Sequence, residues 1–172
     1  MERLYRVKIM HTSAYTDARA FVDRYLPATP ISVADIGSYD FNGSLKPLFN
    51  RDGWSYLGFD IIPGPNVDSV LTQPYGWGES MANSFDVAVS TQVLEHIERP
   101  WDWIKDVAAI VKPGGLIYIC TPHTMHYHAH PKDCWRVWPD GMKALLESAG
   151  LTVIEARMQN IDTTGIARKE KP

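Results

Sequence analysis

The sequence predicts an α/β fold in which helices cover both faces of a doubly wound, mostly parallel sheet. Short apolar runs of the kind that form buried strands lie at residues 31–36, 54–60, 85–90 and 115–120. Segments with the apolar spacing of an amphipathic helix lie at residues 14–26, 100–111 and 139–149. Strands that alternate with helices in this way are typical of doubly wound sheets.

The composition is that of a globular domain. The chain has 172 residues, of which 45% are hydrophobic and 22% are charged. We therefore expect a single domain over residues 1–172, with its core at about 31–168. The two cysteines, Cys120 and Cys134, give no disulfide framework.

Charge and hydropathy disfavour several classes of partner. The net charge is −3, the isoelectric point is about 6.0, and no basic run is present, so nucleic acid is an unfavoured partner. The sequence shows neither a signal peptide nor a membrane span, so we expect a cytoplasmic protein that does not bind membranes.

The first half of the chain is expected to hold two helices, one of them short, and three strands. Residues 1–12 are expected at the surface, and Thr12 or Ser13 is a candidate cap for the helix at 14–26. The strand at 31–36 leads into a turn and a short helix at 44–49, and the next strand covers 54–60. Pro and Gly in residues 61–66 disfavour a crossover helix there, so a loop is expected before a strand at 67–71.

The second half is expected to continue the alternation. The strand at 85–90 is followed by a helix at 100–111 with Pro100 in its first turn. After the strand at 115–120 we expect an insertion at about 121–138, and then a helix at 139–149 that ends at Gly150. Two last strands are expected at 151–157 and 163–168.

Two acidic residues lie where strands end. Asp35 closes the first strand just before Gly37, where the absence of a Cβ lets a ligand approach the main chain. Asp60 closes the second strand, about 25 residues later, where a carboxylate can accept hydrogen bonds from the hydroxyls of a ribose. The alternative interpretation is an ordinary strand-to-helix turn without a ligand.

The order of these motifs resembles class I S-adenosylmethionine-dependent methyltransferases over about residues 31–168. The motifs are Asp35-Ile36-Gly37, Phe59-Asp60, Ser84-Phe85-Asp86, Leu94-Glu95-His96-Ile97, and Lys112-Pro113-Gly114-Gly115-Leu116. The turn from Gly37 to Ser44 and the stretch from Cys134 to Met142 are similar to those of small bacterial or phage-type, methyltransferase-11-like enzymes. In one departure from the family pattern, Tyr39 stands at the second glycine of the turn.

The resemblance implies a Rossmann-like sheet of seven strands with an antiparallel last strand, and S-adenosyl-L-methionine as cofactor. It implies Gly37 near the methionine end of the cofactor, Asp60 at its ribose, and Gln73 or an aromatic side chain at its adenine. The alternatives are core packing for Tyr75 and Trp77 and a solvated loop for Gln73. The expected cofactor-binding residues are Asp35, Gly37, Ser38, Asp60, Ile61, Gln73, Tyr75, Thr91 and Gln92.

The insertion after the fifth strand is the expected acceptor side. It holds four of the six histidines, and a histidine is suited to deprotonate a hydroxyl. The candidate catalytic residues are His96, His123 and His128, and the candidate substrate-binding residues are Tyr127, Trp135 and Arg136.

Other interpretations of this insertion stay open. No metal site is predicted, although His126, His128 and His130 alternate along the chain and, with Asp133, offer ligand types that metals use. A purely structural role for the histidines is a further alternative. Arg136 is suited to an acidic substrate group or to an ion pair with Asp133 or Asp140.

The resemblance implies an enzyme that transfers a methyl group from S-adenosylmethionine to a small-molecule or glycan acceptor, at a hydroxyl oxygen. Because little sequence lies outside the core, the acceptor pocket is expected to be shallow or to be completed by a second subunit, as in a homodimer. The alternatives are a catalytically silent cofactor-binding scaffold, or a protein or nucleic-acid acceptor. A nicotinamide-dependent dehydrogenase is disfavoured, since the turn after Asp35 lacks the Gly-x-Gly-x-x-Gly spacing.

Overall fold

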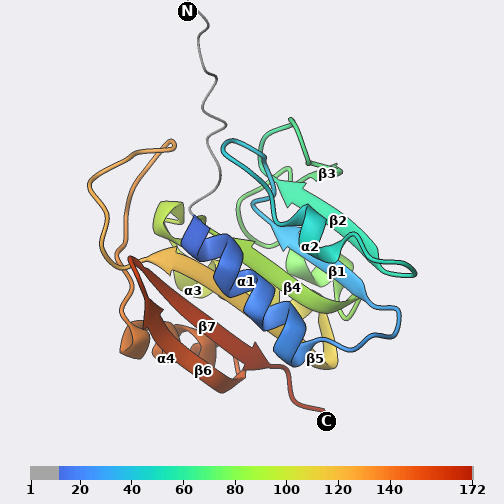
Figure 1. The fold of residues 1–172 in the computed structure, drawn as a ribbon. Coiled ribbons are helices and arrows are strands. Elements are labelled where there is room, and N and C mark those ends of the chain that lie inside the picture. Colours follow the sequence, from blue (N-terminus) through green and yellow to red (C-terminus); the bar gives the residue numbers. More distant parts are fainter. Residues whose placement is uncertain (1–11, 172) are drawn as a thin grey trace, which may run out of the picture.

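A computed structural model describes residues 12–171, so the expectation that residues 1–12 lie at the surface falls almost wholly outside the described part. One seven-stranded sheet runs through the molecule in the order β3-β2-β1-β4-β5-β7-β6 (Figure 1). The strands are β1 (Ser32–Ile36), β2 (Ser55–Asp60), β3 (Ser69–Val70), β4 (Phe85–Thr91), β5 (Val111–Pro122), β6 (Thr152–Gln159) and β7 (Asp162–Arg168). The helices are α1 (Thr12–Tyr25), α2 (Lys46–Phe49), α3 (Pro100–Ile110) and α4 (Pro139–Ser148), with 3-10 turns η1 (Gly78–Met81) and η2 (Leu94–His96).

The strand directions confirm the predicted fold class. Strands β1 to β5 pair in parallel, whereas β7 is antiparallel to both β5 and β6. The chain order reverses between β1 and β4, which lie side by side at the centre of the sheet. In open α/β sheets, ligands bind outside the carboxyl ends of the strands at such a switch point.

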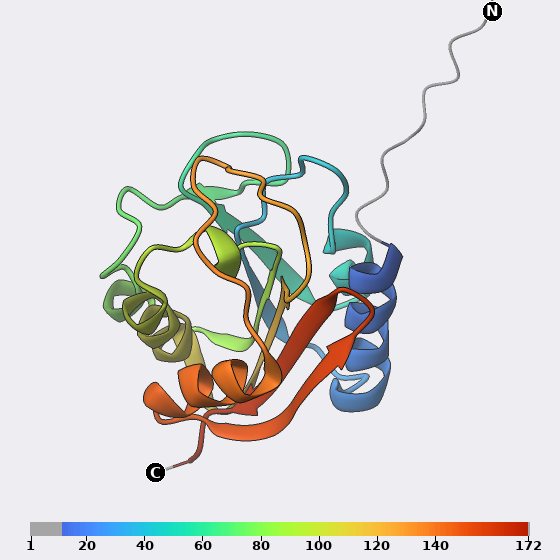
Figure 2. The ribbon, with the colours of Figure 1, turned by 90° about the vertical axis from the view of Figure 1, so that its left-hand side faces the viewer.

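Helices cover both faces of the sheet. Helices α3 and α4 lie on one face, and α1 and α2 lie on the other (Figures 1 and 2). The central strand β4 divides its side chains between them: Ala88 joins the core under α3 and α4, and Val87 and Val89 join the core under α1. Burial on both faces explains why the centre of β4, Val87-Ala88-Val89, is apolar throughout instead of alternating.

The segment from β2 to β3 and the start of β5 are compared with their predicted bounds. The loop between β2 and β3 contains no helix, as predicted, and β3 is only two residues long. Strand β5 begins at Val111 rather than at residue 115, because Val111 pairs with Phe85 ahead of an irregularity in the β4–β5 ladder.

Helix α1 is attached to the sheet by a buried carboxylate. Asp17 accepts a hydrogen bond from the Tyr118 hydroxyl on β5 at 3.0 Å and another from the Thr164 hydroxyl on β7. The guanidinium of Arg157, on β6, also donates to Asp17. Because Asp17 is 2% exposed, this one side chain links α1 to three strands away from water.

We expect Asp17→Ala to lower the free energy of unfolding by about 3 kcal/mol, since it leaves three donors without their buried acceptor. The control is Asp23→Ala on the same helix, whose carboxylate forms an exposed ion pair with Arg51 at 3.4 Å. Asp23→Ala should lower the free energy of unfolding by about 1 kcal/mol or less. Urea unfolding measures both, and equal losses would contradict the linking role of Asp17.

Candidate active site

The turn after β1 is tied to the end of β2. The main-chain amides of Gly37 and Ser38 both donate to the carbonyl of Phe59, at 2.7 and 3.0 Å. Gly37 has a φ of +82°, and a Cβ there would lie 2.2 Å from the side chain of Val93. The turn therefore requires glycine at this position, for its backbone conformation and for space.

Behind the turn, Asp35 belongs to a buried hydrogen-bond network. The Tyr56 hydroxyl donates to Asp35 Oδ2 at 2.6 Å and accepts from Asn66 Nδ2 at 2.9 Å. The Asn66 amide also donates to the carbonyl of Ser38 at 3.0 Å, and Ser38 Oγ donates back to the Asn66 carbonyl. The network joins the end of β1 and the start of β2 to the loop before β3, so Asp35 is linked to the turn through Tyr56 and Asn66.

Burial raises the pKa of Asp35 to about 6, and the charge of Asp60 adds to the rise. The hydrogen bond from Tyr56 opposes this shift without cancelling it. Asp35 thus exchanges its proton near neutral pH although it lies inside the sheet.

Asp60 lies at the exposed side of the same edge. Its Oδ2 accepts from the Tyr39 amide and its Oδ1 accepts from the Ile62 amide, both at 3.2 Å. Each oxygen therefore keeps a lone pair for a further donor. The next side chain, Ile61, is 51% exposed, and so is much of Phe41, whose ring packs against Tyr39, the residue whose amide bonds Asp60.

The predicted residues beyond β3 and β4 divide into different environments. Trp77 is buried in the core, which is the alternative considered for it, and Gln73 is exposed. Tyr75 packs against the core, and the Arg99 guanidinium lies 4.1 Å from the centre of its ring. Gln92 donates through its side chain to Asp162 at 3.0 Å, which ties the end of β4 to β7.

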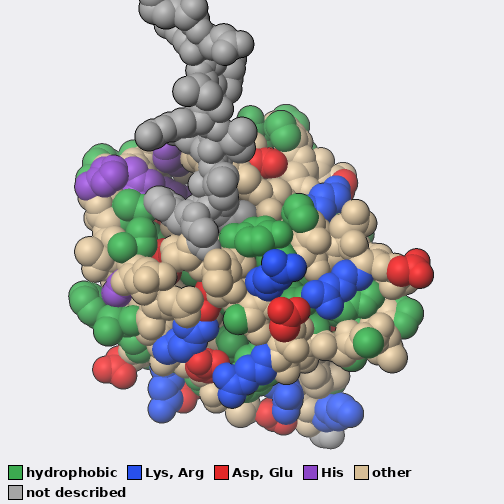
Figure 3. Space-filling model, in the orientation of Figure 1, with side chains coloured by type: hydrophobic (Ala, Val, Ile, Leu, Met, Phe, Trp, Pro, Cys, Tyr) green, Lys and Arg blue, Asp and Glu red, His purple; other side chains and the backbone are tan. Residues whose placement is uncertain are grey.

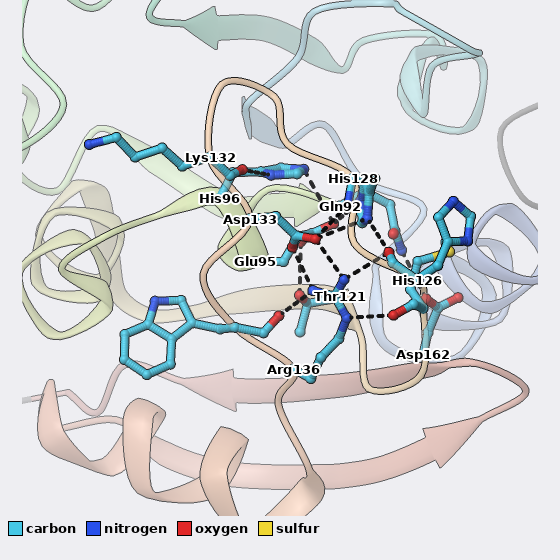
Figure 4. Close-up of polar contacts among 12 residues, drawn as sticks. Gln92, Glu95, His96, Thr121, His126, His128, Lys132, Asp133, Arg136 and Asp162 are labelled. Atoms are coloured by element: carbon cyan, nitrogen blue, oxygen red, sulfur yellow. Dashed lines mark hydrogen bonds and ion pairs between the residues drawn. The ribbon is translucent and has the colours of Figure 1, made fainter.

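At the end of β4, three side chains face one another. We call Glu95, His96 and His128 the Glu95 cluster (Figure 4). Glu95 and His96 come from η2 and His128 from the insertion. The Nε2 atoms of His96 and His128 lie 3.7 and 3.9 Å from Glu95 Oε1.

Glu95 is a carboxylate without exposure to solvent. Its Oε2 accepts from the Thr121 hydroxyl at 2.9 Å, whereas its Oε1 has no hydrogen-bond partner among the described residues. Burial raises the pKa of Glu95 to about 7 and lowers the pKa of His96.

The insertion that supplies His128 has no helix or strand between residues 123 and 138, yet it is fastened over η2. The amides of Cys134 and Trp135 donate to the Glu95 carbonyl at 2.7 and 3.2 Å, and Trp135 Nε1 donates to the Ile97 carbonyl. Histidines gather at this edge of the molecule (Figure 3).

The candidate substrate-binding residues meet at one shallow hollow. Tyr127, Trp135 and Arg136 line it, with Met125, Asp133 and Cys134, and its volume is about 290 Å³. Tyr127 is 76% exposed, so its ring is available to a ligand.

Arg136 forms an ion pair with Asp133, which was one of the alternatives to binding an acidic substrate group. Its Nη1 and Nη2 donate to the two oxygens of Asp133 at 2.6 and 2.8 Å, and this bond holds the pKa of Asp133 well below its usual range. Its remaining donors bond to the carbonyls of Met125, His126 and Trp135. All five N–H groups of the guanidinium are thus in use, and an acidic substrate group would have to displace one of these bonds.

The structure does not bring His123 to the Glu95 cluster. Its Nδ1 lies 2.7 Å from the Ile161 carbonyl, and its ring packs against Trp138. The sequence analysis assigned no role to Glu95 itself. The pattern that could have indicated it is the Glu-His pair in the turn that follows the polar end of β4.

Along residues 12–171, no helix is both long and apolar enough to cross a membrane.

Comparisons with known proteins agree with this architecture. A family model described as a methyltransferase domain matches residues 10–156. A ubiquinone biosynthesis O-methyltransferase of Methylobacterium nodulans is 25% identical, with 83% of this chain and 66% of the relative covered. An uncharacterized methyltransferase of Mycobacterium bovis is also 25% identical, with 68% of this chain and 49% of the relative covered. The chain therefore spans about half to two thirds of the length of these relatives.

A solved structure of similar fold is the 1,6-didemethyltoxoflavin-N1-methyltransferase of Burkholderia thailandensis. It has a TM-score of 0.70 and 17% sequence identity, and the match covers 92% of this chain and 79% of the other. At this identity the likeness concerns the fold alone.

The raised pKa of Asp35 predicts how stability changes with pH. Because the folded state holds this proton more tightly than the unfolded state, the free energy of unfolding should fall as pH rises from about 4 to 6. Asp35→Asn removes the titration, so its stability relative to the wild type should increase by about 1–3 kcal/mol between pH 4 and pH 7. Urea unfolding at several pH values measures the difference, and parallel curves for the two proteins would refute the buried titration.

Proposed function

The chain belongs to the methyltransferase-domain family of class I, S-adenosylmethionine-dependent enzymes, and from this premise we propose that it methylates a hydroxyl oxygen of a small-molecule or glycan acceptor. The observation that carries the proposal is the Glu95 cluster, where two imidazoles and a carboxylate meet beside the ends of β4 and β5. The name of the Methylobacterium nodulans relative, an O-methyltransferase, supports oxygen as the acceptor atom.

The residues at the ends of β1 and β2 fit the cofactor. When bound, S-adenosylmethionine supplies a methyl group attached to a positively charged sulfur. Once the methyl group is transferred, the sulfur is left as a neutral thioether. Asp60 offers its remaining lone pairs to the ribose hydroxyls, and the exposed side chain of Ile61 offers apolar surface to the adenine. Gly37 and Ser38 present the turn that faces the methionine part, and Thr91 and Gln92 are proposed to border the reacting side.

The acceptor is proposed to lie over the hollow beside the Glu95 cluster. The rings of Tyr127 and Trp135 provide flat surface, and His96 and His128 hold the acceptor hydroxyl through their Nε2 atoms. As the hydroxyl oxygen bonds to the methyl carbon, its proton leaves to the cluster or to water. The proposed catalytic role is confined to His96 and His128, because the His123 ring is bonded at Ile161, away from the cluster.

We expect Asp60→Ala to weaken binding of S-adenosylhomocysteine by about 1–3 kcal/mol, through loss of charge-assisted hydrogen bonds to the ribose. Titration calorimetry measures the change. Asp52→Ala is the control, since Asp52 is exposed in the turn before β2, at the opposite end of that strand. An unchanged dissociation constant for Asp60→Ala would remove this carboxylate from the cofactor site.

The acceptor assignment is tested by transfer of labelled methyl groups from S-adenosylmethionine to matched panels of hydroxyl and amine compounds. We expect methylation of hydroxyls, and a loss of about 10²-fold in turnover for His128→Ala with cofactor affinity preserved. His126→Ala is the control, since its exposed ring lies outside the Glu95 cluster. Transfer to amines alone would overturn the hydroxyl assignment, and cofactor binding without any transfer would favour the scaffold alternative.

A further inference from the structure

We propose that the Glu95 cluster binds a divalent transition-metal cation through Glu95 Oε1 and the Nε2 atoms of His96 and His128. One ligand atom of each residue lies within 4.8 Å of those of the other two, and the two Nε2 atoms lie 3.7 and 3.9 Å from Glu95 Oε1. The residues come from two segments that are more than thirty residues apart in the sequence. Figure 4 shows the three side chains directed toward a common point.

Both imidazoles are held in the orientation and tautomer that a metal ligand needs. The Nδ1 atom of His96 lies 2.5 Å from the Lys132 carbonyl, and that of His128 lies 3.0 Å from the His126 carbonyl. A carbonyl oxygen only accepts, so each Nδ1 carries the hydrogen and each Nε2 keeps its lone pair. Histidine ligands in metal sites commonly donate their second ring N–H to a main-chain carbonyl in this way.

The third ligand is a buried oxygen without a partner. Glu95 Oε1 has no hydrogen bond among residues 12–171, although the side chain has no exposure to solvent. Neither Nε2 supplies one, since the separations of 3.7 and 3.9 Å exceed hydrogen-bond length. A buried, unsatisfied carboxylate oxygen is costly, and a cation between it and the imidazoles would remove that cost.

The spacing fits a metal centre after a small contraction. Ligand atoms at about 2.0–2.1 Å from a tetrahedral zinc ion lie about 3.3–3.4 Å from one another. The separations of 3.7 and 3.9 Å exceed this by a few tenths of an ångström, and His128 lies on a segment that no helix or strand constrains.

The charges next to the cluster leave the carboxylate uncompensated. The charge of Arg136 is matched by Asp133, whose two oxygens accept from Nη1 and Nη2 at 2.6 and 2.8 Å. Lys132 is paired with Glu98 at the surface. A divalent cation would therefore meet a net negative environment.

The ligand types select the metal. Two imidazoles and one carboxylate suit zinc and neighbouring first-row metals, whereas magnesium and calcium prefer oxygen alone. Three protein ligands leave at least one coordination position open. If the proposed function holds, the acceptor hydroxyl would bind at that open position instead of directly at the two Nε2 atoms, and the cation would lower the pKa of the hydroxyl; this role, unlike the binding itself, rests on the proposed function.

The test uses the full chain, purified without a polyhistidine tag, stripped with a chelator and studied without cofactor or acceptor. Zinc titration by calorimetry should show one equivalent bound, zinc should raise the temperature of unfolding, and cobalt should give the visible absorption of a four-coordinate site. His128→Ala and Glu95→Gln should weaken zinc binding by about 10²-fold or more. His126→Ala should bind zinc as the wild type does, since its exposed ring lies on the same segment but outside the cluster.

Two results would overturn the inference: no stoichiometric zinc uptake by the wild type, or uptake that His128→Ala leaves unchanged. If Glu95→Gln fails to fold, zinc binding by His128→Ala still tests the proposal, because His128 is partly exposed whereas Glu95 is buried. Metal binding is measured without methyl transfer, so a protein that binds zinc and methylates no hydroxyl would refute the proposed function and leave the metal site standing.

Discussion

The candidate active site depends on a carboxylate that is buried beneath a segment without regular secondary structure. Glu95 has no exposure to solvent, and the insertion at residues 123–138 forms its cover. The cover is fixed by main-chain bonds from Cys134 and Trp135 to the Glu95 carbonyl, and by the contact of His96 with the Lys132 carbonyl. The same residue therefore anchors the insertion through its main chain and presents an unsatisfied oxygen through its side chain.

A segment without helix or strand needs other partners for its main-chain groups, and Arg136 supplies many of them. It bonds three carbonyls of the insertion as well as Asp133. Asp133 in turn accepts from the His128 amide at 2.7 Å, which positions the imidazole that faces Glu95. Arg136, which the sequence analysis considered for binding an acidic substrate group, thus stabilises the conformation of the insertion on the acceptor side.

The other half of the site is organised from within the sheet. The network of Asp35, Tyr56 and Asn66 connects β1, β2 and the loop before β3, and it leaves Asp60 at the exposed edge. The parallel pairing of β1 with both β2 and β4 brings the ends of these strands to the same edge. The cofactor residues and the Glu95 cluster consequently lie on either side of the switch point between β1 and β4.

The sequence by itself determined the fold class, the order of the strands and helices, and the loop in place of a helix before β3. These follow from local properties, namely apolar periodicity and the positions of Pro and Gly, which do not depend on distant residues. Only the tertiary structure decided that Trp77 packs in the core, that Arg136 pairs with Asp133, and that His128 meets His96 while His123 does not. The reason is physical: side-chain partners in an irregular segment depend on how it folds over η2, and that path is set by bonds between residues far apart in the chain.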